Sequence, residues 1–499
     1  MNVILNLLKN KNSFFINTSI IIMSGFIIKI LGLLNKIIIT RYLGTEGMSL
    51  YILSFPTILL FLNISTLNIN NCISKIVSES LISKEFSSKQ IILSAIKIIL
   101  ISSLISIIIF LIILKPLVTI LLRNQQLLFP LLSTIILIPL TGINDVLKGY
   151  YNGIKNIYKT SLANLLEQFS RIGFVVIVLS LSINKGLVYA TTLSLIALSF
   201  GELLSLIYLI IQIKKEKLTA FHSKDPTKKI LSLAIPSTSS KLIGNITYFL
   251  EPIIYTHILV FLKYDYNLIQ FNYTIINAYT IPLLTSASFI SIALATTIIP
   301  NISENYIKQN FNAINYYIKR TLMFSLIPGI LISILFFTYP NEYMNLIYNT
   351  SEGTSFIKPF VFFFLIYYLQ MPFSSILHSI GKNKIQFIIS TLFSILRIIL
   401  IIVFSFIPSI GINSIFFAIL ITMILNSIII ILIVFKYTKY KFNYKNMFKL
   451  ILITIICINI LYLINFFQLN YLINSIIISI IFLGLCYCFD LININFLKN

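Results

Sequence analysis

Fourteen long apolar runs divide this 499-residue chain and constrain its fold more than any other feature. Each run is close to the roughly 20 residues that an α-helix needs to cross a bilayer. Inside lipid every backbone polar group must be satisfied internally, and runs of this length do not have the alternation of barrel strands. The sequence therefore predicts an all-α polytopic membrane protein with 14 transmembrane helices, near residues 14–39, 49–70, 90–114, 127–147, 160–183, 187–213, 230–259, 272–299, 317–339, 355–378, 385–408, 411–435, 449–468 and 471–490.

Composition excludes several other classes of protein. The chain is 58% hydrophobic and only 10% charged, with a mean hydropathy of +0.97, far outside the soluble globular range. The net charge of +23 is spread singly over short loops, which fits membrane topology better than a nucleic-acid surface. The four cysteines lack metal or redox spacing, and no glycine-rich phosphate loop is present. We therefore expect no metal, no cofactor and no nucleic-acid partner.

The distribution of lysine and arginine predicts the orientation of the chain. With the N-terminus inside the cell, few of the 37 basic residues fall in outer loops, and these are Arg41, Lys115, Arg123, Lys185, Lys263 and Lys358. Basic residues concentrate on the cytoplasmic side of membrane proteins. The N-terminal segment is not expected to be a cleavable signal, because the apolar run at residues 14–39 is too long for the apolar part of one and no A-x-A site follows it. Both termini are therefore predicted to be cytoplasmic.

An internal repeat organises the first twelve helices. Four features recur in the same order, namely Lys29 to Gly32 with Lys241 to Gly244, Pro56 with Pro282, Ser78-Glu79 with Ser303-Glu304, and Gly153 to Arg171 with Gly381 to Arg397. Six helices per repeat give both halves the same orientation, as in transporters that rock two bundles about a central site. The predicted parts are an N-terminal six-helix bundle (1–213), a cytoplasmic linker (214–229), a C-terminal six-helix bundle (230–435), a basic cytoplasmic loop (436–448), and two extra helices (449–499).

Five cations fall inside the predicted spans. Four of them lie about 17 to 22 Å into a hydrocarbon layer of about 30 Å, and a cation at that depth must face a cavity or a partner. Several Lys and Arg groups around a cavity suit an anion, above all a phosphate. We therefore predict a cationic substrate-binding cavity formed by Lys29, Lys36, Arg171, Lys241 and Arg397.

Structural pairing is the alternative role for these charges. Glu167 and Arg171 are spaced i, i+4 and can pair along one helix face. Glu202 and Glu251 are the other acids inside spans, and they can neutralise cations, hold helices together or couple transport to an ion. No acid lies one turn from Arg397. The sequence leaves both roles open.

Three stretches resemble a known family of transporters. They are Lys29 to Tyr51, Asn68 to Glu79, and the KGYYNG hairpin that runs from Leu147 to Arg171. Together they resemble the polysaccharide and lipid II flippases of the MATE-related (MOP) superfamily, in the branch of stage V sporulation protein B. The lipid II flippases carry an Arg-Asp pair where this chain has Asn35 and Lys36.

This resemblance implies a 14-helix alternating-access transporter in the cytoplasmic membrane of a bacterium. It implies a central cationic cavity for the pyrophosphate-saccharide head of a lipid-linked glycan, with Lys29 and Lys36 at basic positions of the family. It also implies a groove, made partly by helices 13 and 14, for the prenyl tail. The expected partners are this substrate and membrane lipids, and the protein is expected to be a monomer.

Export of a prenyl-diphosphate-linked saccharide is therefore the leading hypothesis, with membrane potential or a monovalent cation as a driving force. The runner-up is a cation-coupled multidrug exporter of the same superfamily, which would need acids to hold organic cations, whereas the first helix has two lysines and no acid. A membrane-embedded transferase would need clustered acid/base groups. The acids expected on the outer side appear scattered along the sequence, at Glu46, Asp265, Glu342 and Glu352. We therefore predict a transporter and not an enzyme.

Overall fold

The structure is a computed structural model that describes residues 13–182, 185–219, 225–440, 442, 444–466 and 470–491. Of the side chains in these ranges, those of residues 13–23, 82, 240, 292–297 and 300 are left undescribed. Parts of the predicted linker 214–229 and of the loop 436–448, and both ends of the chain, lie outside the described residues. Every secondary-structure element in the described ranges is a helix, which confirms the all-α prediction.

The chain forms two compact units. Unit 1 comprises residues 1–274 and 394–415, and unit 2 comprises residues 275–393 and 416–499. The division places the seventh predicted span and part of the eleventh with the N-terminal helices. The predicted limits of the two six-helix bundles stay a prediction.

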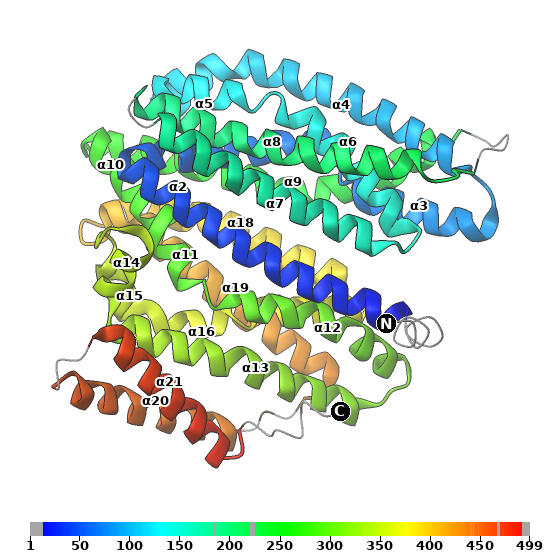
Figure 1. The fold of residues 1–499 in the computed structure, drawn as a ribbon. Coiled ribbons are helices and arrows are strands. Elements are labelled where there is room, and N and C mark those ends of the chain that lie inside the picture. The colour runs from blue at the N-terminus through cyan, green and yellow to red at the C-terminus, as the bar shows by residue number, and fades with distance from the viewer. Residues whose placement is uncertain are drawn as a thin grey trace. The chain divides into compact units, whose positions relative to one another are not determined.

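Unit 1 begins with α2 (Ser13–Thr66), a helix of 54 residues (Figure 1). A straight helix of that length would measure about 81 Å, far more than the roughly 30 Å of a hydrocarbon layer. The helix is interrupted at Gly44, where φ is 62° and ψ is −168°, a conformation open essentially only to glycine. The two spans predicted near 14–39 and 49–70 are thus the two arms of α2, joined at Gly44.

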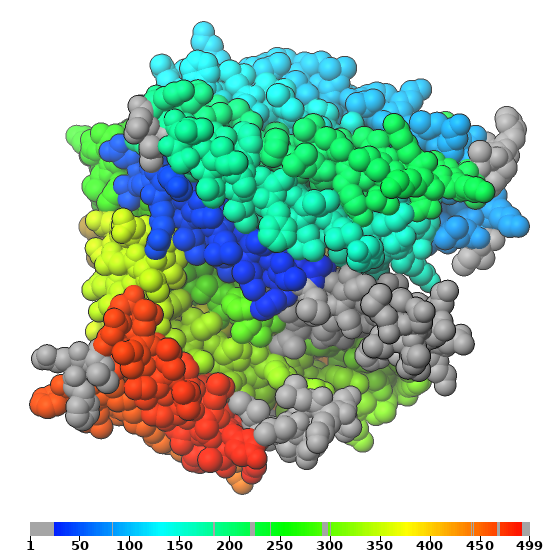
Figure 2. All heavy atoms as spheres, viewed as in Figure 1, coloured from blue at the N-terminus to red at the C-terminus, as the bar shows by residue number. Residues whose placement is uncertain are grey.

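The other helices of unit 1 follow in order. They are α3 (Ile69–Ser83), α4 (Ser88–Pro116), η1 (Leu117–Leu121), η2 (Gln125–Leu127), α5 (Leu128–Ser133), α6 (Leu137–Gly153), α7 (Ile157–Ser182), α8 (Leu187–Lys214), α9 (Thr227–Phe261), α10 (Tyr266–Thr274), the second half of α18 (Asn383–Ser405) and η6 (Gly411–Asn413). Helix α2 packs against α7, and Figure 2 shows its visible N-terminal arm, in blue, directly against the teal side chains of α7.

Two glycines of the KGYYNG hairpin explain how α6 meets α3. A Cβ atom added at Gly149 would lie 2.7 Å from the carbonyl oxygen of Asn70, and one added at Gly153 would lie 2.6 Å from the Cβ of Val77. This G-x-x-x-G spacing places both glycines on one helix face, where they let two membrane helices approach closely. The hairpin is therefore a packing element, and a buried cluster that includes Ile73 and Tyr151 surrounds it.

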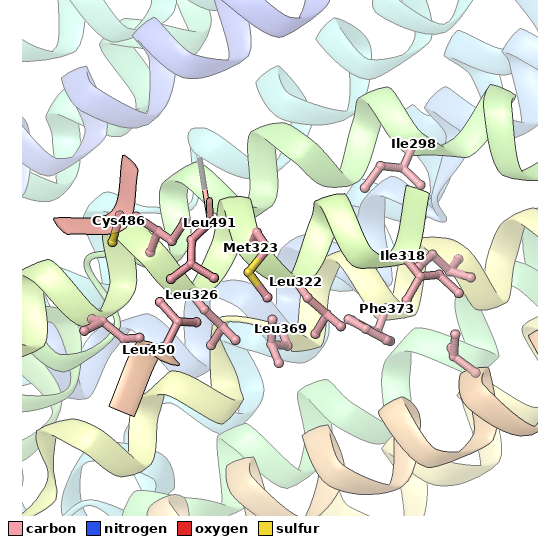
Figure 3. Close-up of a cluster of buried hydrophobic side chains, with 14 of the residues drawn as sticks. Ile298, Ile318, Leu322, Met323, Leu326, Leu369, Phe373, Leu450, Cys486 and Leu491 are labelled. Atoms are coloured by element: carbon pink, nitrogen blue, oxygen red, sulfur yellow. The ribbon is translucent and has the colours of Figure 1, made fainter. Parts of the chain in front are cut away.

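Unit 2 contains the remaining helices. They are η4 (Ile275–Thr280), α11 (Ile281–Leu284), α12 (Ser288–Ile307), α13 (Phe311–Thr338), α14 (Pro340–Tyr348), α15 (Thr354–Phe360), η5 (Val361–Phe363), α16 (Phe364–Tyr367), α17 (Gln370–Ser379), the first half of α18, α19 (Ser414–Thr438), α20 (Tyr444–Asn465) and α21 (Tyr471–Cys488). Their core is a continuous apolar cluster to which α12, α13, α17, α20 and α21 contribute (Figure 3).

Eleven helical segments among the described residues are long and apolar enough to cross a membrane. The first of them, Ser24–Leu81, has 58 residues and covers two predicted spans. The spans predicted near 230–259 and 272–299 are not among the eleven, but they coincide with α9 and with α10 to α12. The chain is a multi-pass membrane protein, and a helix lies over every predicted span.

Candidate functional site

All eight charged residues predicted inside the spans belong to unit 1. Their helices are α2 (Lys29 and Lys36), α7 (Glu167 and Arg171), α8 (Glu202), α9 (Lys241 and Glu251) and α18 (Arg397). Helix α2 packs against α7, α8 and α9. The site can therefore be described within one compact unit.

Glu167 holds two cations. Its Oε1 accepts a hydrogen bond from Arg171 Nη2 at 2.7 Å, and its Oε2 accepts one from Lys148 Nζ at 3.0 Å. The Glu167–Arg171 pair expected from the i, i+4 spacing is therefore present. Helix α8 comes close at this point because Gly201 has no side chain, since a Cβ there would lie 2.8 Å from the carbonyl oxygen of Glu167.

Lys148 is a member of this cluster that the sequence analysis missed. Its side chain is 9% exposed, and it interacts electrostatically with Glu202 and Asp145 as well as with Glu167. The residue sits near the end of a predicted span and was expected to be one of many cytoplasmic-loop lysines. The signal that could have found it is the spacing of Asp145 and Lys148, which places both on one face of α6.

Glu202 is held by Asn144 of α6, which is itself fixed by Ser205 of α8. The side-chain amide of Asn144 donates to Glu202 Oε2 and also to Ser205 Oγ, the latter at 3.0 Å. Both Asn144 and Ser205 are fully buried. Glu202, Asp145 and Glu167 thus act together on Lys148, and Glu167 also holds Arg171, so this cluster leaves little positive charge for an external anion.

Arg397 finds its acid on another helix. Its Nη1 lies 3.5 Å from Glu251 Oε2, and Glu251 is 1% exposed. The sequence has no acid within one helical turn of Arg397, and its partner comes instead from α9, 146 positions away in the sequence. The two repeat-related arginines are therefore both ion-paired, Arg171 within its own helix and Arg397 between helices.

None of the three predicted lysines forms an ion pair among the described residues. Lys241 Nζ donates to the neutral side chain of Asn68 at 2.6 Å, at the break between α2 and α3 where Asn68 has a φ of 51°. Lys29 is exposed and Lys36 is partly buried, and within the described residues neither ammonium group has a hydrogen-bond or ion-pair partner. These lysines are the cations left for a ligand.

Unit 2 contains an apolar groove of about 410 Å³. It lies where α20 packs beside α13 and the η5–α16 segment, and it is lined by Leu326, Ile330, Phe362, Leu365, Met447, Leu450, Ile451, Thr454, Ile455 and Ile458. All but one of these side chains are hydrocarbon or thioether. Among the described residues no group of three His, Cys, Asp or Glu side chains is placed to hold a metal ion.

Comparison with family models gives two matches. The model described as polysaccharide biosynthesis protein matches residues 14–306, more than half of the chain. A second model, MatE, matches residues 277–403.

Individual proteins agree with these models. Stage V sporulation protein B of Bacillus subtilis (strain 168) is 29% identical over 425 residues, which are 83% of this chain and 82% of the relative. The lipid II flippase MurJ in an inward closed conformation superimposes with a TM-score of 0.65 at 19% identity, covering 94% of this chain and 99% of the flippase.

An inward-facing multidrug resistance MATE family transporter of the MOP superfamily gives a TM-score of 0.62 at 14% identity, covering 83% of this chain and 94% of the transporter. Because family and fold are those of transporters, the prediction that the chain is not an enzyme is confirmed. The chain belongs to the polysaccharide biosynthesis protein family, and its fold is that of the MOP-superfamily transporters.

Proposed function

We propose that this protein is an alternating-access flippase that exports a prenyl-diphosphate-linked saccharide across the cytoplasmic membrane of a bacterium, with both termini in the cytoplasm. The observation that carries the proposal is a set of three lysines on two packed helices of unit 1, Lys29, Lys36 and Lys241, which form no ion pair with an acid among the described residues. The names of the relatives, which include a lipid II flippase, point to the same class of substrate.

The charge of the lysines favours a diphosphate. An ammonium group inside a span costs at least about 2.5 kcal/mol, so three of them are costly unless they serve a ligand or a water-filled cavity. Charge-assisted hydrogen bonds to phosphate oxygens contribute about 1.5–3 kcal/mol each. A diphosphate carries enough negative charge and enough acceptor oxygens to engage several lysines together.

The groove of unit 2 suits the other end of such a substrate. Its wall of Leu, Ile, Phe and Met side chains has almost no hydrogen-bonding groups, as an isoprenoid chain requires. Burial of each CH₂ group there contributes about 0.8 kcal/mol in an aqueous reference, and less when the chain comes from lipid. The groove would therefore position the prenyl tail but add little to the affinity for it. Helix α20, which lines the groove, corresponds to one of the two helices expected to form it.

Transport requires that the substrate bind one facing state better than the other, because a ligand shifts an equilibrium only by its differential affinity. Membrane potential or a monovalent cation would drive the empty carrier back. The buried acids Glu167, Glu202 and Glu251 are the groups available for such coupling.

A multidrug exporter is less well supported. An organic cation needs an acid that is free to receive it, whereas Glu167 holds two cations, Glu251 holds Arg397, and Glu202 is held by Asn144. Among the described residues, each of these three acids therefore already has a partner. The unneutralised groups of this site are lysines, which would repel a cationic drug.

The test is to deplete the protein and measure the fraction of lipid-linked glycan precursor that is accessible at the outer leaflet. We expect that fraction to fall and the cytoplasmic pool to rise. Restoring the wild-type chain should reverse the effect, whereas Lys241→Glu should not. Lys228→Glu is the matched control, because it reverses an exposed lysine near the start of the same helix. Unchanged precursor accessibility after depletion would refute the proposed function.

A further inference from the structure

A polar cavity of about 680 Å³ lies in unit 1 and contains none of the predicted cations. Its volume falls within the range of about 300–1,000 Å³ that small-molecule sites occupy. Eight of its eleven lining side chains are polar, and among them are two carboxylates and four carboxamides, those of Glu46, Asp265, Asn124, Gln126, Asn267 and Gln270. Glu46 and Asp265 looked scattered in the sequence, but the fold brings them to one cavity.

Hydrogen bonds fix one wall of this cavity. The side-chain amide of Asn124 donates to Gln270 Oε1 at 3.2 Å, and the Tyr266 hydroxyl donates to the carbonyl oxygen of Leu122 at 2.6 Å. Asp265 Oδ1 accepts the backbone N–H groups of Asn267 and Leu268 at the start of α10. Helix α10 is thereby tied to the segment around η2, and the side chains it carries have defined positions.

Other lining groups have hydrogen-bonding capacity to spare. Among the described residues, the Glu46 carboxylate and the side-chain amides of Gln126 and Asn267 have no hydrogen-bond partner. The hydroxyl of Ser49 also indicates a ligand, because this residue lines the cavity, is 7% exposed and has no hydrogen-bond partner among the described residues. A buried hydroxyl without a partner costs about 1–3 kcal/mol, which a ligand in the cavity would recover.

The chemistry of the lining selects one class of ligand. A phosphate is excluded because no Lys or Arg lines the cavity. A metal ion is disfavoured because no cluster of three metal-ligating side chains exists among the described residues. Carboxylates accept, carboxamides both donate and accept, and hydroxyls do both, which is the complement of neighbouring sugar hydroxyls. Phe271 and Leu268 add apolar surface for the C–H face of a sugar ring.

We propose that this cavity is a carbohydrate-binding site that receives the saccharide part of the substrate. The inference rests on the proposed function and extends it, because the diphosphate and the saccharide would then be held by different parts of unit 1. The lining residues come from the start of the second arm of α2, from the segment around η2, and from the start of α10 with Asp265 just before it. The predicted topology places these three segments at the outer face. The cavity would therefore hold the saccharide on the exit side.

The experiment measures saccharide binding directly, without lipid or phosphate. The full chain in nanodiscs is titrated with a panel of soluble bacterial cell-wall and capsular saccharides, and binding is followed by saturation-transfer difference NMR. We expect at least one saccharide to bind, and the double variant Glu46→Gln with Asn267→Ala to weaken that binding roughly tenfold or more. Both positions are exposed, so the variant is expected to fold. Glu342→Gln is the matched control, since it removes a predicted outer carboxylate that does not line the cavity.

Two results would overturn the site, namely no binding by any saccharide of the panel, or equal binding by the wild type and the double variant. The precursor-accessibility assay separates this inference from the proposed function. Saccharide binding that the double variant loses, together with unchanged accessibility after depletion, would support the site and refute the flippase. Reduced accessibility after depletion without saccharide binding would do the reverse.

Discussion

Replacing Lys148 with methionine is the most direct test of the charge cluster in unit 1. The substitution keeps the length of the side chain and removes the ammonium group that lies 3.0 Å from Glu167 Oε2. Glu167 would keep Arg171, but Glu202 and Asp145 would lose the cation with which they interact. Removing one member of a buried ion pair typically costs about 3–5 kcal/mol, because a charge is left uncompensated.

This cost can be converted into a shift of the unfolding temperature. With an unfolding entropy of about 2.1 cal/mol/K per residue over the roughly 300 residues of unit 1, a loss of about 3–5 kcal/mol lowers Tm by about 5–8 °C. A thiol-reactive fluorescent dye provides the assay, because Cys72 is buried in unit 1 and reacts once the unit unfolds. Cys457, Cys486 and the exposed Cys488 should be replaced by alanine in every variant, so that the signal reports unit 1.

Lys159→Met is the matched control. Lys159 is also paired with an acid, Glu216, but both side chains are more exposed, at 19% and 29%. Such a pair contributes about 1 kcal/mol or less, so Tm should fall by no more than about 2 °C. Adding Glu202→Gln to Lys148→Met should recover part of the loss, since Glu202 is an acid that the substitution leaves without its cation, whereas Glu167 keeps Arg171. If Lys148→Met and Lys159→Met lowered Tm equally, the buried cluster would not have the energetic role described here.

Three further predictions follow from single contacts. Gly149→Leu should reduce the yield of folded protein in the membrane, since the Cβ of the leucine would collide with α3. Gly484→Leu should be tolerated, because no atom lies within 4 Å of the Cβ position there. Size-exclusion profiles of the two variants distinguish these outcomes. Arg397→Gln should lower Tm by several degrees, and Glu251→Gln in the same chain should restore much of it; no recovery would contradict the pairing. Hydrogen bonds from the hydroxyl and N–H of Thr227 hold the pKa of Asp225 below its ordinary value of 3.8. The contribution of Asp225 to the stability of the start of α9 should therefore be present above pH 4 and lost as the pH falls through the lowered pKa. Hydrogen exchange of the first amides of α9 measures this, and Asp225→Asn should abolish the pH dependence.

The helices could be predicted from the sequence because length and hydropathy decide which segments can enter a bilayer. The break at Gly44 could not be predicted in this way. Hydropathy shows two apolar runs, but it does not show that the segment between them is also helical except at one residue. The role of the KGYYNG hairpin was also hidden. Its glycines looked like part of a polar turn, and only the position of α3 shows that they allow two helices to touch.

The charges of the site were predicted as a set, but only one of their pairings could be matched from the sequence. Arg171 and Glu167 could be matched from an i, i+4 spacing, since one helix face fixes their distance. Arg397 and Glu251 lie on helices whose adjacency no local pattern encodes. Lys148 was missed for a related reason, because a lysine near a span end is usually a topology signal, and its three acidic neighbours come partly from other helices.

These pairings change which residues can test transport. From the sequence alone Arg397 and Lys241 were equivalent candidates, because both are cations at similar depth in their predicted spans. In the structure Arg397 is bound to a buried acid, so reversing its charge would place two acids together and destabilise unit 1 whatever the substrate is. Lys241 is exposed, donates to the neutral Asn68 and forms no ion pair among the described residues, so reversing its charge breaks no ion pair. Asp145, which Lys241 also influences electrostatically, keeps its stronger interaction with Lys148. A loss of export in a stably folded Lys241→Glu protein therefore indicates weaker binding of the ligand. The same loss in an Arg397 variant is already explained by destabilisation of unit 1.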